Sequence, residues 1–173
     1  MVPMKVLGIA GFSGSGKTTL IERTIPVLVQ AGLRVSLIKH AHHAFDVDQP
    51  GKDSYRHRHA GCTEVLVSSG NRWALMHELR GAPEPPLGEQ LKHLSPCDLV
   101  LVEGYKKEPI AKIEVHRREA MLPLIHPTDA NVVAIATDEP LETQLPQLPL
   151  DDADAVARFI VHWAGFDRAR LVR

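Results

Sequence analysis

The chain has 173 residues, enough for one domain with a sizeable buried core and no stabilising disulfides. Its formal net charge is −1 with both signs mixed along the chain, which argues against nucleic acid held by a basic surface. Cys62 and Cys97 form no C-x-x-C pair, so we expect both to be reduced and buried. The apolar run near the start is too short for a signal peptide or a membrane span. We therefore expect one cytoplasmic domain over 1–173 without membrane contact.

The first half of the chain alternates strand and helix patterns. Apolar spacing predicts a strand over 6–10, a helix over 19–30 that contains Pro26, a strand over 34–40 and a loop over 41–52. Asp53 or Ser54 is expected to cap a helix that ends near 61. Two strand-like runs, 63–68 and 72–77, flank a Ser-Gly-Asn turn. They predict an antiparallel hairpin attached to an otherwise parallel sheet.

The second half continues the alternation. We expect a short helix over 87–94, a buried strand over 98–104, strands over 111–116 and 132–137, an amphipathic helix over 151–164 and a frayed tail over 168–173. Strands that alternate with helices along a chain are typical of a parallel sheet covered by helices. The sequence therefore predicts a three-layer α/β sandwich.

A glycine-rich loop joins the first strand to the first helix. Residues 11–18 read Gly-Phe-Ser-Gly-Ser-Gly-Lys-Thr, a G-x-x-x-x-G-K-[ST] motif in the strand–loop–helix order that it requires. Glycines let successive N–H groups turn toward a phosphate chain, and the helix N-terminus adds a favourable dipole. Lys17 is expected to neutralise the β- and γ-phosphates, and the Thr18 hydroxyl to ligate Mg²⁺. The loop predicts a P-loop NTPase whose nucleoside triphosphate is held by Gly11, Ser13, Gly14, Ser15, Gly16, Lys17 and Thr18.

Two acidic residues flank the buried strand over 98–104 and compete for the place near Mg²⁺. Ligands of such sheets bind at the carboxyl ends of the strands. Five residues of extended chain put Asp98 and Glu103 about 16 Å apart, so only Glu103 can lie near Thr18. Glu103 is expected to hold Mg²⁺ or to position the attacking water, and an ordinary strand-end acid is the alternative.

A histidine-rich loop follows the strand over 34–40. His40, His42 and His43, with Asp46 and Asp48, offer imidazole and carboxylate groups that suit Zn²⁺ or Ni²⁺. Their spacing sets no tetrahedral geometry, however, and polar contacts to phosphate, substrate or a partner are the alternative. Asp138, at the end of the strand over 132–137, is the candidate to read the nucleotide base, with a plain turn residue as the alternative. Guanine rather than adenine does not follow from these residues alone.

Five segments in this order resemble one family. They are residues 11–18, Ile38-Lys39-His40 with His42-His43, Pro50-Gly51-Lys52-Asp53-Ser54, Arg72-Trp73-Ala74-Leu75-Met76, and Leu101-Val102-Glu103-Gly104-Tyr105-Lys106. The set is similar to the molybdopterin-guanine dinucleotide biosynthesis adaptor proteins, the MobB family, over roughly Met4 to Trp163. The resemblance implies a GTP- and Mg²⁺-binding homodimer with weak GTPase activity. Such proteins assist the guanylyltransferase of the MobA family that joins GMP to molybdopterin, itself a further candidate ligand. By position, residues 14–19 hold the phosphates, which adds Thr19, and Glu103 belongs to the Walker B strand.

Three functions remain open at the level of the sequence. The first is an adaptor GTPase in molybdenum cofactor biosynthesis, with Lys17 and Glu103 at the reacting phosphate. The second is a small-molecule kinase that uses the same loop. The third is a metal or cofactor chaperone whose histidine loop is the functional site.

Overall fold

The computed structural model describes residues 4–41 and 45–166. The chain divides into two compact units, one of Met1–His40 with Leu94–Arg173 and the other of Ala41–His93. We describe each unit by itself, and the expectation of a single domain over 1–173 stays a prediction. Among the described residues, no helix is both long enough and apolar enough to cross a membrane.

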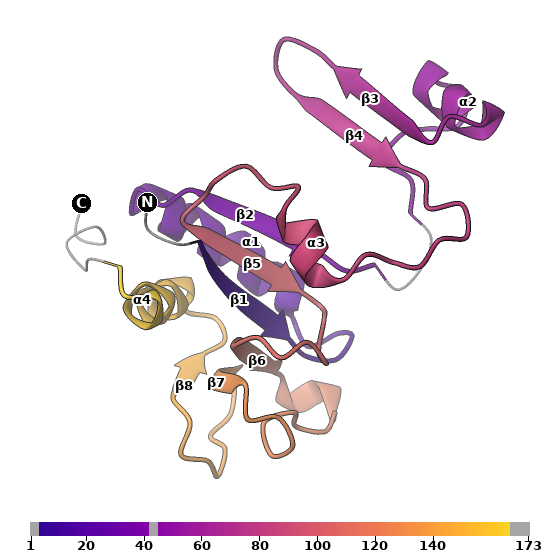
Figure 1. Ribbon diagram of the computed structural model, residues 1–173. Coiled ribbons are helices and arrows are strands. Elements are labelled where there is room, and N and C mark those ends of the chain that lie inside the picture. The colour runs from indigo at the N-terminus through magenta and orange to yellow at the C-terminus, as the bar shows by residue number, and fades with distance from the viewer. Residues whose placement is uncertain (1–3, 42–44, 167–173) are drawn as a thin grey trace. The chain divides into compact units, whose positions relative to one another are not determined.

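A six-stranded parallel sheet forms the centre of the first unit (Figure 1). Its order is β2-β5-β1-β6-β7-β8, with every neighbouring pair parallel. The strands are β1 (Lys5–Ala10), β2 (Val35–Lys39), β5 (Leu99–Glu103), β6 (Lys112–His116), β7 (Val132–Thr137) and β8 (Gln147–Pro149). The predicted α/β class with a mostly parallel sheet is confirmed. β8 is an addition, since its three residues carry no strand pattern of their own.

Two helices cover one face of this sheet. α1 (Lys17–Gln30) and α4 (Ala153–Ala164) contribute to one apolar core with alternate residues of the strands. Each fully buried leucine or isoleucine contributes about 1.5–3 kcal/mol. Pro26 lies within α1 without ending it. The core includes Leu7, Ile9, Leu99, Leu101, Ile113 and Val115 of the sheet, Leu20, Ile21 and Leu28 of α1, and Val156, Ile160 and Val161 of α4.

The side of β6 turned away from this core carries buried polar groups. The Lys112 ammonium is fully buried and donates to the carbonyls of Lys106 and Glu108 at 2.8 Å and to Asp129 Oδ2 at 2.6 Å. The Glu114 carboxylate accepts the backbone N–H groups of Ile125 and His126 at 2.6 and 2.9 Å. Because buried polar groups are costly unless they are paired, these bonds attach the irregular segments before and after β6 to the sheet.

The second unit contains α2 (Asp53–Ala60), β3 (Glu64–Ser68), β4 (Trp73–His77) and α3 (Leu87–Leu91). The predicted hairpin is present, with Leu66 opposite Leu75. Our expectation that it joins the parallel sheet is wrong: β3 and β4 form a separate two-stranded sheet. An antiparallel pair completes its own ladder through its turn, so its periodicity does not reveal which sheet it joins.

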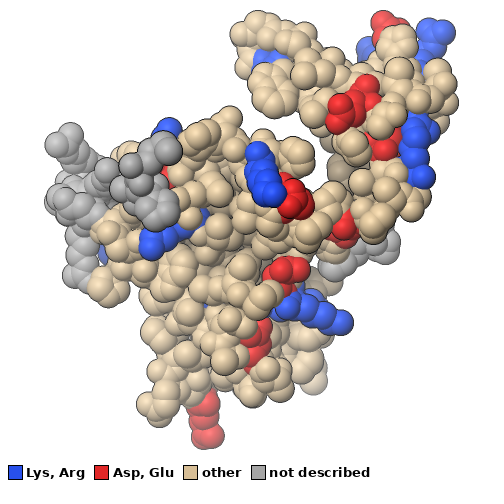
Figure 2. All heavy atoms as spheres, in the orientation of Figure 1, with Lys and Arg blue, Asp and Glu red and all other residues tan. Residues whose placement is uncertain are grey.

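Two local predictions also need correction. The N-cap of α2 is Lys52, which makes no side-chain capping bond, and Asp53 is the first helical residue. Cys97 is buried as predicted, whereas Cys62 is exposed, since it follows α2 at the surface. The tail over 168–173, predicted to fray, lies outside the described residues. Figure 2 shows Lys and Arg side chains interspersed with Asp and Glu side chains on the visible face, as the balanced composition predicts.

Candidate functional site

The carboxyl ends of β2, β5 and β1 meet at one edge of the sheet. Lys39 lies opposite Glu103 in the β2–β5 ladder, and Glu103 lies opposite Ile9 in the β5–β1 ladder. Glu103 therefore shares the face of Leu99 and Leu101, which pack in the core with α1. This register places its carboxylate at the N-terminus of α1, directly after the glycine-rich loop.

The backbone of the loop requires glycine at two positions for different reasons. A Cβ atom at Gly11 would lie 2.6 Å from the Val115 carbonyl and 2.6 Å from Ser15 Oγ, closer than any real contact. Gly16 is the N-cap residue of α1 with φ +96°, a left-handed conformation that side chains disfavour. The motif thus encodes both a close approach of two chain segments and a turn into the helix.

Thr18 and Glu103 are in direct contact. The Thr18 hydroxyl donates to Glu103 Oε1 at 2.8 Å, and Lys39 Nζ lies 3.4 Å from Glu103 Oε2. The Glu103 side chain is 8% exposed, so the carboxylate is largely desolvated and held in one orientation. The adjacency predicted from strand length is therefore confirmed, while the roles of Thr18 and Glu103 as Mg²⁺ ligands stay predictions.

The surroundings of Lys17 disfavour its positive charge. Its Nζ donates to the Phe12 carbonyl at 2.7 Å. Burial lowers the pKa of the Lys17 ammonium, Glu103 opposes this shift, and the positive charges of Lys106 and Lys39 add to it. Lys106 Nζ also lies 4.0 Å from the centre of the Phe12 ring. Lys39 and Lys106 thus add positive charge near Lys17, which Glu103 partly offsets, and a polyanion would stabilise all three lysines.

The loop residues fit a bound phosphate chain in one further respect. Ser15 is buried, and its hydroxyl has no hydrogen-bond partner among the residues that the structure describes. A buried hydroxyl without a partner is costly and so is uncommon in native structures. Gly14 has φ +84° at the top of the loop, and Ser13, Thr18 and Thr19 are exposed beside it.

Asp138 lies across the loop from Glu103, directly after β7. Asp138 Oδ1 accepts the backbone N–H of Arg118 at 2.9 Å, and Oδ2 lies 3.6 Å from Arg117 Nη1. The residue also lines an open depression of about 450 Å³. The depression is bounded by Thr137, Asp138, Glu139, Pro140, Gln147, Leu148, Pro149, Leu150 and Asp151. Its volume lies within the range of small-ligand sites.

Arg117 was not among the site residues expected from the sequence. It directly follows β6, and its guanidinium lies against the glycine-rich loop: a Cβ atom at Gly16 would be 3.6 Å from Arg117 Nη2. Its position after a predicted parallel strand was the available signal, because such positions share one edge of the sheet. Asp98, by contrast, lies at the opposite edge as predicted, where it accepts the Arg34 N–H at 2.8 Å.

The candidate metal ligands of the histidine-rich loop do not come together within the described residues. Among these residues, no group of three or more His, Cys, Asp or Glu side chains is arranged to hold a metal ion. His42 and His43 lie outside the described residues. The His40 ring lies 4.8 Å from the Tyr105 ring, centre to centre.

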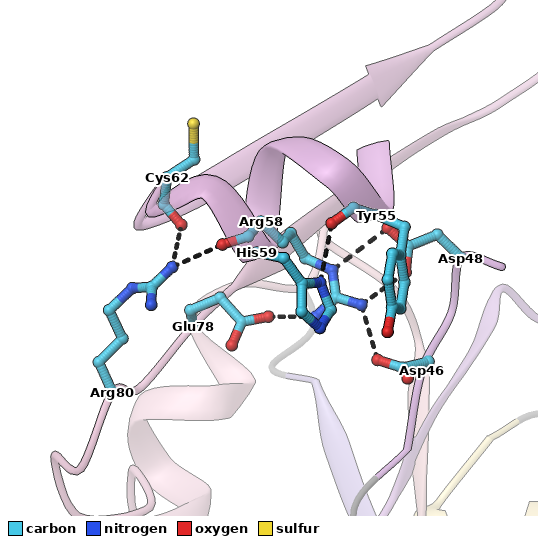
Figure 3. A network of polar contacts seen from close by, with 8 residues as sticks. All are labelled: Asp46, Asp48, Tyr55, Arg58, His59, Cys62, Glu78 and Arg80. Atoms are coloured by element: carbon cyan, nitrogen blue, oxygen red, sulfur yellow. Dashed lines mark hydrogen bonds and ion pairs between the residues drawn. The ribbon is translucent and has the colours of Figure 1, made fainter. Parts of the chain in front are cut away.

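Asp46 and Asp48 instead bind a buried arginine in the second unit (Figure 3). Arg58 donates to each of them at 2.6 Å and also to Glu78. These bonds raise the pKa of the Arg58 guanidinium, and the bond to Asp48 contributes most to this shift. The same bond lowers the pKa of the Asp48 carboxyl. Arg80 adds bonds to the carbonyls of Arg58 and Cys62 at 2.8 and 2.9 Å. The network joins the loop before α2 to the end of β4.

Comparison with known proteins places the chain in a family. The sequence model of the family described as molybdopterin guanine dinucleotide synthesis protein B matches residues 6–138, from β1 to Asp138. The chain belongs to the MobB family. The resemblance inferred from the five ordered segments is thereby confirmed.

Full-length relatives of this MobB chain agree with that assignment. It is 46% identical to the molybdopterin-guanine dinucleotide biosynthesis adapter protein of Haemophilus influenzae, over 91% of this chain and 88% of that protein. It is 43% identical to the Escherichia coli adapter protein, over 94% of both chains. Solved MobB structures share the fold. The match to a crystal structure of molybdopterin-guanine biosynthesis protein B spans 91% of this chain and 99% of that protein, with a TM-score of 0.74 and 27% identity. The crystal structure of Bacillus subtilis MobB matches 92% of this chain and 97% of that protein, with a TM-score of 0.72 and 28% identity.

Proposed function

We propose that this MobB family member is a GTP-binding adaptor with slow GTPase activity that assists the attachment of GMP to molybdopterin. The observation that carries the proposal is the Thr18–Glu103 hydrogen bond beside Lys17 in the phosphate loop. A hydroxyl, a desolvated carboxylate and a lysine at a helix N-terminus form the donor set that a magnesium nucleotide requires. The pathway is that of the relatives, which are molybdopterin-guanine dinucleotide biosynthesis adapter proteins.

The chain's own residues would supply the chemistry of slow hydrolysis. The loop N–H groups and Lys17 would hold the phosphate chain and stabilise the charge that develops on it. Mg²⁺ bound by Thr18, with Glu103 beside it, would neutralise the phosphates. Glu103 would also orient the attacking water, since its buried carboxylate is fixed by Thr18 and Lys39. Asp138 would accept hydrogen bonds from the guanine base within the depression that it lines.

The proposal includes a homodimer. Leu66, Trp73 and Leu75 share one face of the β3–β4 hairpin and are 59%, 64% and 46% exposed, so Trp73 does not fill the core. A two-stranded sheet with an uncovered apolar face is marginal alone. A second copy of the chain would cover this face, and Leu75→Glu should then convert dimer to monomer in light scattering. A monomeric wild-type protein would contradict this part of the proposal.

The decisive experiment is calorimetry with GTP and ATP in Mg²⁺, together with turnover measured with and without a MobA-family guanylyltransferase. The wild-type protein should prefer GTP and turn it over slowly, and Asp138→Asn should reduce the preference. An unchanged ratio of GTP to ATP affinity in Asp138→Asn would show that the base is read elsewhere. Rapid turnover on addition of a small-molecule acceptor, rather than the guanylyltransferase, would favour a kinase instead.

A further inference from the structure

The Arg117 guanidinium lies near both the glycine-rich loop and the Asp138 carboxylate. β6 and β7 are neighbouring parallel strands, and their last residues, His116 and Thr137, are paired in register. Arg117 and Asp138 are therefore the first residues beyond two adjacent strand ends. The Arg117 guanidinium lies between Gly16 of the phosphate loop and the Asp138 carboxylate.

Arg117 and the lysine of β2 lie on opposite sides of β1 in the sheet order. In the sheet order, β5 and β2 lie on one side of β1, whereas β6 and β7 lie on the other. Lys39 and Glu103 end the strands on the first side. Arg117 directly follows a strand on the second side and pairs with Asp138, which lines the depression. This position of Arg117 favours a role near the nucleobase rather than near the terminal phosphate.

Asp138 is held at two points but keeps capacity for a ligand. Oδ1 accepts the Arg118 backbone N–H at 2.9 Å, and Oδ2 faces Arg117 Nη1 at 3.6 Å, which is an ion pair rather than a hydrogen bond. A carboxylate offers about four acceptor sites, so it still has room for the two adjacent N–H donors of a guanine edge. Two anchors from one short segment fix the plane of the carboxylate before the base arrives.

From these contacts we propose that Arg117 is a positioning residue that sets base specificity by orienting Asp138 against the phosphate loop. The inference rests on the proposed function, because it deepens the reading of Asp138 as the residue that contacts guanine. The Arg117 side chain is 33% exposed and that of Asp138 is 24% exposed, so the pair is only partly screened by solvent. Loss of Arg117 leaves the Asp138 carboxylate held by the Arg118 N–H at Oδ1, with its plane less firmly fixed.

The test is calorimetry of the full chain with three probes in Mg²⁺: GDP, ADP and inorganic pyrophosphate. Arg117→Ala should weaken GDP binding about fivefold, the upper range for a partly exposed ion pair. ADP and pyrophosphate should bind as they do to the wild type, so that the ratio of GDP to ADP affinity falls. Arg117→Lys, which keeps the charge, should restore part of the ratio.

Arg118→Ala is the matched control. The Arg118 side chain is 77% exposed and pairs with Glu139, while only its backbone N–H reaches Asp138, so the ratio should not change. In an Asp138→Asn background, Arg117→Ala should have no further effect on the ratio. Melting temperatures of all variants establish that they are folded.

Two results would overturn the inference, and they are distinguishable from each other. If Arg117→Ala weakens all three probes equally, or leaves the ratio intact, Arg117 does not position Asp138, and the proposed function stands. If the wild-type protein itself binds GDP and ADP equally, the proposed function fails and this inference fails with it.

Discussion

Thr18 and Glu103 are 85 positions apart in the chain and share a hydrogen bond of 2.8 Å. The bond exists because Glu103 ends a strand beside β1, while Thr18 lies in the first turn of α1, the helix that follows β1. It joins the helix after the glycine-rich loop to the neighbouring strand, at the edge where parallel sheets bind ligands.

Glu103→Gln tests this relationship. The amide keeps the shape but removes the negative charge that would attract Mg²⁺. We expect the gain in GTP affinity on adding Mg²⁺ to shrink by about tenfold, while affinity in EDTA is kept or improved. Asp98→Asn, at the other end of β5, is the control and should leave the Mg²⁺ effect unchanged. An intact Mg²⁺ effect in Glu103→Gln would exclude Glu103 from the metal site.

Lys17→Ala should abolish nucleotide binding without unfolding the protein. We expect a loss of GTP affinity of at least about 100-fold, because the charge-assisted contact to phosphate is removed. Burial and the nearby lysines lower the pKa of Lys17, which means that the charged form is disfavoured in the folded protein. The variant without nucleotide should therefore melt no lower than the wild type. Exposed Lys107→Ala is the control, and full GTP affinity in Lys17→Ala would remove the premise of the site.

Lys112→Met should destabilise the first unit. It would leave two backbone carbonyls and the Asp129 carboxylate without their shared donor, at a cost of roughly 3 kcal/mol in the free energy of unfolding. Chemical denaturation measures this difference. A loss below about 1 kcal/mol would indicate that water replaces the ammonium.

The same contact makes stability depend on pH in acid. Lys112 lowers the pKa of the Asp129 carboxyl from its usual 3.8, so the ionised form is preferred in the folded protein. The resulting stability is present above the usual pKa and is lost as pH falls through the lower folded value. Asp129→Asn should therefore be less stable than the wild type at neutral pH, and the difference should narrow below about pH 4. A difference that is constant with pH would contradict the role of the charge.

Arg58→Ala should destabilise the second unit. Three carboxylates, those of Asp46, Asp48 and Glu78, would lose their common partner and repel one another. The melting temperature should fall clearly more than in Arg56→Ala, whose side chain is 74% exposed and lies 4.0 Å from Asp53. Equal effects of the two substitutions would show that the network contributes no more than surface charge.

Features that depend on neighbouring residues were predictable from the sequence. The glycine positions of the loop, the strands over 6–10, 34–40, 98–104, 111–116 and 132–137, and the hairpin follow from backbone dihedrals and from apolar periodicity. Even the Thr18–Glu103 contact followed, because strand length and the common edge of a parallel sheet leave one choice of acid. The ordered motifs also sufficed to indicate the family.

Other features were decided only by the tertiary structure. The isolation of the β3–β4 hairpin depends on which edges are available for pairing, and β8 exists only because β7 offers it an edge. Arg117 meets Gly16 and Asp138 through strand register, and Arg58 gathers its carboxylates from separate segments. Local patterns encode how each segment folds. A charged side chain can pair with residues that are distant in the sequence. Packing and strand register select these partners, and no local pattern contains that information.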